Sequence, residues 1–98
     1  MKEKEFFERK LGKYRREIDK IDNKFINLLN KRGKIVQKIG ILKNQVNKKI
    51  FQPQREKEII ERMKKKSEIL KNVSIEAIWK EILSACKLIQ GLEIKDEK

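Results

Sequence analysis

Arg32 is a cation on an otherwise apolar stripe of the sequence. Residues of this stripe are separated alternately by four and by three positions: Phe7, Leu11, Tyr14, Ile18, Ile21, Phe25, Leu28, Arg32, Ile35, Ile39, Leu42 and Val46. A buried guanidinium without a partner is unfavourable, so Arg32 is expected to pair with a carboxylate or to line a site that an anion fills. A polar residue that fixes the register of paired helices is the structural alternative, and the stripe by itself leaves it open.

Two further cations on the same stretch could share an anionic ligand with Arg32. Lys43 follows Arg32 by eleven residues, close to three helical turns, so both lie on nearly the same face about 16 Å apart. Arg15 precedes Arg32 by seventeen residues, about 25 Å along the helix axis, and could reach the same ligand only from another subunit. Lys43 could instead be a lysine on the surface, and Arg15 could be a solvated arginine.

Polar side chains further along the chain could line the same site. Arg55 and Glu56 fall in the first turn of a helix expected to begin at Pro53, where unpaired backbone N–H groups favour anions. A glutamate in a first turn is, however, more often simply a partner of the helix dipole. Gln90 continues an apolar stripe near the end of the sequence, although it could equally be a residue at a fraying helix end. Cys86, on that stripe, is more simply a buried apolar residue than a nucleophile, because the sequence has no histidine to activate it.

The charge balance restricts the classes of partner and of chemistry. The sequence carries 27 Lys and Arg against 15 Asp and Glu, a net charge of +12, which favours nucleic acid, an acidic membrane surface or a small polyanion as ligand. The absence of histidine and the single cysteine make metal and acid–base histidine chemistry poor fits. No leader and no apolar run of about eighteen residues is present, so we expect a cytoplasmic protein.

The elements that would position these residues are helices. The stripe predicts one helix over residues 4–47, about 60 Å long, whereas a domain of this size is only about 25 to 30 Å across. Such a helix cannot bury its stripe against its own chain, so we expect it to pair with a second copy. Gly33 and Gly40 interrupt it and mark either a close approach to a helix or ligand, or a bend.

The rest of the sequence predicts two shorter helices within a single domain, residues 1–98. Ser74 is the expected N-cap of the last helix, with Glu76 in its first turn. The expected segments are a loop at 47–52, a helix over 53–67, a helix over 74–90 and a frayed tail at 91–98.

The sequence closely resembles the all-helical (type II) chorismate mutases. The resemblance covers residues 11–90 and rests on five segments: 14–22 (YRREIDKID), 28–32 (LLNKR), 39–43 (IGILK), 53–56 (PQRE) and 82–90 (ILSACKLIQ). It is specific because several sparse polar positions match together. It implies an all-α, three-helix fold, an intertwined homodimer and the rearrangement of chorismate to prephenate, without cofactor or metal.

The resemblance also implies a role for each cation. Arg15 matches an arginine lent to the site by the other subunit, and Arg32 matches the arginine that grips the substrate carboxylates with it. Lys43 matches a lysine that binds a carboxylate and the ether oxygen, and Arg55 matches a residue that lines the pocket.

Among uncharged and acidic positions, Glu56 matches the acceptor for the ring hydroxyl, and Gln90 matches a second donor to the ether oxygen. Gln52 departs from the family pattern, where an aspartate often precedes the proline, and Cys86 stands where a small hydroxyl residue is frequent. Neither departure removes a cation, so activity is expected to survive.

Two other functions compete with the mutase. An isochorismate-pyruvate lyase of the same fold would use similar cations, but the complete set of Arg, Lys, Glu and Gln favours the mutase. A non-enzymatic basic coiled-coil protein would bind nucleic acid or another helix. The arginine on the apolar stripe argues against it, so we expect neither nucleic acid nor membrane as partner.

Overall fold

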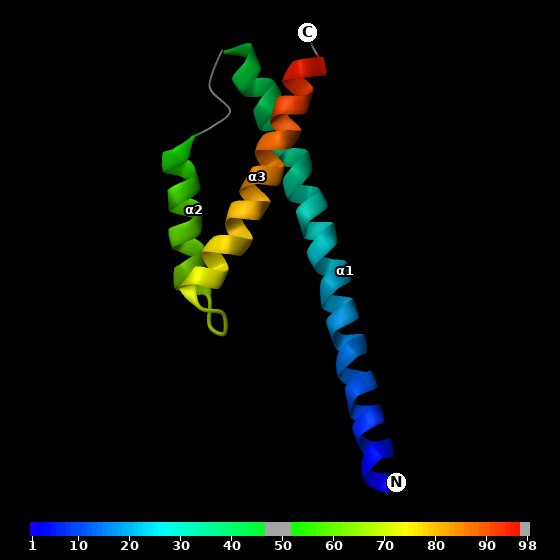
Figure 1. Cartoon of the computed structure of the whole chain (residues 1–98). Coiled ribbons are helices and arrows are strands. Elements are labelled where there is room, and N and C mark those ends of the chain that lie inside the picture. Colours follow the sequence, from blue (N-terminus) through cyan, green and yellow to red (C-terminus); the bar gives the residue numbers. More distant parts are fainter. Residues whose placement is uncertain (47–51, 97–98) are drawn as a thin grey trace. The chain divides into compact units, whose positions relative to one another are not determined.

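The structure is a computed structural model that describes residues 1–46 and 52–96, with side chains described as far as Gln90. Within these ranges the chain forms three α-helices and no strand: α1 (Lys2–Gln45), α2 (Pro53–Lys66) and α3 (Asn72–Asp96) (Figure 1). This confirms the expected all-α class with one very long first helix. Except for Gln52, the loop expected at residues 47–52 lies outside the described residues. No described helix combines the length and the apolar composition that a membrane span requires.

Helix α3 differs from its predicted bounds at both ends. The Lys71 carbonyl accepts hydrogen bonds from the backbone N–H groups of Ser74 and Ile75, both at 3.0 Å, so the helix begins at Asn72. The prediction that Ser74 is the N-cap was therefore wrong, and Glu76 lies beyond the first turn. The tail expected to fray is also helical as far as Asp96. A single glycine at position 91 costs only about 1 kcal/mol, and the helix formers that follow it let the helix continue.

By its internal contacts the chain divides into two units, residues 1–32 and 33–98. The first unit is the N-terminal part of α1, and none of its residues is buried. Six apolar members of its heptad stripe are each more than half exposed: Phe7, Tyr14, Ile18, Ile21, Phe25 and Leu28. The first unit therefore presents an apolar stripe that nothing in its own helix covers.

The second unit holds the core. Ile59 and Ile60 of α2 pack with Leu83 of α3, and Met63 and Trp79 border this cluster. Pro53 at the start of α2 suits a position where a backbone N–H would have no helical partner. The adjacent pair Ile59 and Ile60 directs the apolar side of α2 toward α3.

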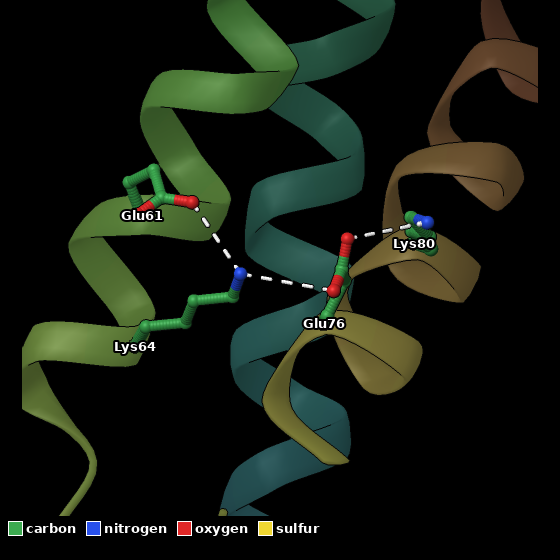
Figure 2. Close-up of polar contacts among 4 residues, drawn as sticks. All are labelled: Glu61, Lys64, Glu76 and Lys80. Atoms are coloured by element: carbon green, nitrogen blue, oxygen red, sulfur yellow. Dashed lines mark hydrogen bonds and ion pairs between the residues drawn. The ribbon is translucent and has the colours of Figure 1, made fainter. Parts of the chain in front are cut away.

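An ion-pair network joins α2 and α3 on the surface of the second unit. Figure 2 shows Lys64 between Glu61 of its own helix, at 3.4 Å, and Glu76 of α3, at 3.7 Å. Lys80 pairs with Glu76 at 3.3 Å. The hydrogen bond from Lys80 and the positive charge of Lys64 lower the pKa of Glu76 below the ordinary value of 4.5. The network therefore depends on an ionised Glu76.

Candidate functional site

Lys43 and Gln90 meet in the second unit, although 47 positions separate them in the sequence. Lys43 lies in the last turn of α1, and its ammonium donates a hydrogen bond of 3.4 Å to Oε1 of Gln90. Gln90 is buried, with 7% of its surface exposed. Since Lys43 engages the amide oxygen, the two N–H donors of the Gln90 amide are directed elsewhere. The pair therefore combines an ammonium with an oriented amide donor.

Gly40 allows α1 to approach α3 at this point. A Cβ atom on residue 40 would lie 3.1 Å from Cγ of Gln90, which is tighter than most Cβ contacts in proteins. Gly33 differs, because a Cβ there would meet Ile89 at an ordinary 3.8 Å. Of the alternatives that the sequence left open for Gly33 and Gly40, a close helix approach is found at Gly40. It places Gln90 beside Lys43, which lies about one turn further along α1.

Glu56 and Lys87 form a second polar contact between helices of the same unit. Glu56, in the first turn of α2, pairs with the Lys87 ammonium on α3 at 3.2 Å. Their side chains are 23% and 34% exposed, so both charges are partly shielded from water. The sequence analysis predicted Glu56 as a site residue but missed Lys87. The available signal was the position of Lys87 three residues before Gln90, because residues so spaced share a helix face.

Three other predicted site residues lie in the second unit. Arg55 is exposed and pairs with Glu58 of its own helix at 3.8 Å. Gln52 is half-buried at the N-cap of α2, and its side chain makes no capping hydrogen bond. Cys86 is a half-buried cysteine, four residues before Gln90 on α3.

Arg15 and Arg32 belong to the first unit. Arg15 is exposed, whereas Arg32, the polar member of the heptad stripe, is half-buried. The structure therefore forms two contacts among these helices, Lys43 with Gln90 and Glu56 with Lys87, and the sequence analysis named three of these four residues.

The grouped residues suit the binding of an anion and the stabilisation of negative charge on oxygen. Two ammonium groups and one buried amide supply hydrogen-bond donors, and one carboxylate supplies an acceptor. Among the described residues, no group of three or more His, Cys, Asp and Glu side chains could hold a metal ion.

Comparison with known proteins identifies the family to which the chain belongs. Residues 14–91 match the profile of the chorismate mutase type II family. The chain belongs to this family. The match begins within α1 and ends just after Gln90, so it includes every residue that the sequence analysis placed in the chorismate mutase site. The resemblance found in the sequence is thereby confirmed.

Two curated relatives carry chorismate mutase names. The chain is 36% identical over 81 residues to the bifunctional chorismate mutase/prephenate dehydratase of Aquifex aeolicus (strain VF5), covering 78% of this chain and 22% of that protein. It is 39% identical over 56 residues to the chorismate mutase of Methanocaldococcus jannaschii, covering 57% of each chain. The chain thus spans about a fifth of the first relative and just over half of the second.

Proposed function

We propose that this protein is a chorismate mutase that rearranges chorismate to prephenate. The contact between Lys43 and Gln90 carries the proposal, because it places two kinds of hydrogen-bond donor on neighbouring helices of a chain that belongs to the family. The reaction is a concerted shift within one molecule: the ether C–O bond breaks as a C–C bond forms, with no proton transferred. A site built from fixed cations and a neutral amide suits such a reaction.

Lys43 and Gln90 act on the ether oxygen. As the C–O bond breaks, negative charge accumulates on that oxygen, and donors already in place stabilise the transition state more than the bound substrate. The Lys43 ammonium has further N–H groups beyond the one given to Gln90. The Gln90 amide, held through its oxygen, directs its own N–H groups to the same ligand atom. Removal of one such donor typically lowers kcat about 100-fold to 1,000-fold.

Arginines hold the two carboxylates of the substrate. Arg32 and Arg15 bind carboxylate oxygens through paired N–H donors, and Arg55 lines the site by turning from its exposed contact with Glu58. This binding holds the substrate in the compact conformer in which its reacting ends meet, which is an orientation effect. Glu56 accepts the hydrogen bond of the ring hydroxyl.

Gln52 and Cys86 complete the lining of the site. Gln52 is the N-cap residue of α2, four residues before Glu56, and Cys86 lies one turn before Gln90 on α3. Neither carries a charge needed by the substrate, so both act through packing and weak hydrogen bonds.

The active unit is an intertwined homodimer. The exposed stripe of the first unit is a heptad seam of the kind that pairs helices, and a second copy would cover it. In this assembly Arg15 comes from one subunit, and Arg32, Lys43 and Gln90 come from its partner. Each dimer then has two equivalent sites.

The test is the conversion of chorismate by the purified protein, followed by loss of absorbance and by quantification of prephenate. Wild type is expected to convert chorismate rapidly, and Arg32→Ala is expected to lose most of kcat/KM. Arg62→Ala is the matched control, because Arg62 is exposed on α2 and has no role in the proposed site. A folded but inactive wild type, or one that releases pyruvate from isochorismate instead, would overturn the proposal.

A further inference from the structure

The ion pair between Lys87 and Glu56 is more shielded from water than the pair between Arg55 and Glu58. It joins α2 to α3 with side chains that are 34% and 23% exposed, whereas Arg55 and Glu58 pair within one helix and are both more than half exposed. Partial burial strengthens the attraction between opposite charges and reduces its screening by salt. The Lys87 ammonium therefore favours one orientation of the Glu56 carboxylate.

The pair lies next to the contact between Lys43 and Gln90. Lys87 precedes Gln90 by three residues, so the two side chains emerge from neighbouring positions on one face of α3. Glu56 reaches this face from the first turn of α2, which packs against α3 through Ile59 and Ile60. Lys87 is thus positioned to set where the Glu56 carboxylate lies relative to Gln90.

We propose that Lys87 is a positioning residue that holds the Glu56 carboxylate ready for the substrate hydroxyl. The inference rests on the proposed function, in which Glu56 accepts that hydroxyl. The Lys87 ammonium engages Oε2, and Oε1 accepts the hydroxyl hydrogen bond, since one carboxylate can accept several hydrogen bonds. A carboxylate already fixed by its partner loses less rotamer freedom when the substrate binds.

Lys87 also makes a carboxylate compatible with a dianionic substrate. An unpaired Glu56 would repel the two carboxylates that the arginines and Lys43 attract. The adjacent ammonium offsets this charge at a distance of 3.2 Å while leaving the carboxylate able to accept a hydrogen bond. Orientation and charge compensation both predict weaker substrate binding when Lys87 is removed.

The test compares kcat and KM for chorismate in wild type and in Lys87→Met. The hydroxyl takes no part in the bond changes, so its contact is made equally in the bound substrate and in the transition state. Loss of such a contact raises KM, here by roughly 10-fold, and leaves kcat within about 2-fold. Lys87→Gln, which keeps a polar side chain, is expected to show the same rise, and Lys87→Arg is expected to restore a KM within about 3-fold of wild type.

Lys80→Met is the matched control. It removes a lysine from the same helix and breaks an ion pair with Glu76, but Lys80 is 64% exposed and belongs to the surface network. Its KM should equal that of wild type. A purely structural role for Lys87 would lower the folded fraction, so kcat would fall while KM stayed constant, and this result would overturn the inference.

The Glu56→Gln background separates positioning from direct binding. If Lys87 acts through the carboxylate, adding Lys87→Met to Glu56→Gln changes KM by less than about 2-fold. A further rise of about 10-fold would mean that Lys87 binds the substrate itself, which contradicts the positioning role. An inactive wild type would overturn the proposed function, whereas an active wild type with unchanged KM in Lys87→Met would overturn only the role of Lys87.

Discussion

The backbone of Gly40 lies so close to the Gln90 side chain that a Cβ atom on residue 40 would come within 3.1 Å of its Cγ. This approach brings the last turns of α1 against α3 and allows Lys43 to reach the Gln90 amide oxygen at 3.4 Å. A residue without a side chain thus determines the geometry of two residues proposed to stabilise the transition state. We therefore expect the packing at Gly40 to affect kcat.

Gly40→Ala is predicted to lower kcat by about 10-fold or more, because the added methyl group displaces Gln90 from its place beside Lys43. Gly33→Ala is the matched control on the same helix. The methyl group there meets Ile89 at 3.8 Å, so kcat should stay near wild type and stability should rise by up to about 1 kcal/mol. Steady-state kinetics and thermal unfolding of both variants check this, and equal losses of kcat would contradict it.

Gln90→Glu is predicted to make activity depend on pH. Wild type should vary little between about pH 5 and 9, because an amide stays neutral over this range. A carboxyl group can donate a hydrogen bond to the ether oxygen only while protonated, and once ionised it opposes the developing negative charge. The activity of the variant should therefore fall by about 100-fold as the pH rises through this range. Profiles of kcat/KM against pH measure this, and parallel profiles would exclude a donor role for residue 90.

Glu76→Gln is predicted to lower stability near neutral pH and to have less effect in acid. Lys80 and Lys64 lower the pKa of Glu76 in the folded protein below 4.5, so the ionised carboxylate contributes stability above that value. The contribution is lost as the pH falls through the lowered pKa and Glu76 becomes protonated. The difference in Tm between wild type and variant should be small at pH 7 and should shrink below pH 4.5.

Glu68→Gln serves as the control for this series, because Glu68 is exposed and forms no ion pair among the described residues. Its Tm should follow that of wild type at every pH. A constant difference between wild type and Glu76→Gln down to pH 3 would show that the network does not act through the charge of Glu76.

The features predicted correctly from the sequence are those that local patterns determine. The heptad stripe predicted α1, and Pro53 predicted the start of α2. Gly40 could be singled out with Gly33 as a close approach or a bend, but the sequence did not decide between these alternatives. Gln90 continues an apolar stripe in the sequence, and in the structure it is buried. These inferences need only the helical period and the properties of single residues.

The features that were missed depend on contacts between helices or on competition at helix ends. Lys87 has no unusual sequence context, and its importance follows from the packing of α2 on α3, which brings Glu56 within 3.2 Å. The start of α3 was misplaced because Ser74 is a good N-cap residue, yet the Lys71 carbonyl accepts the first hydrogen bonds. Favourable capping chemistry at one residue does not prevent the helix from beginning earlier.

The most direct test of the central claim is complementation between two variants expected to be inactive, Arg15→Ala and Lys43→Met, co-expressed and purified together without separating the dimers. If Arg15 serves the partner's site, each mixed dimer has one site with both residues intact. Random pairing makes mixed dimers about half of the total, so about a quarter of wild-type mutase activity should return. Co-expression of Arg16→Ala with Lys43→Met is the control, because Arg16 is a neighbouring arginine that the proposed site does not use. A mixture of Arg15→Ala and Lys43→Met no more active than either variant alone would contradict a site shared between two copies of the chain.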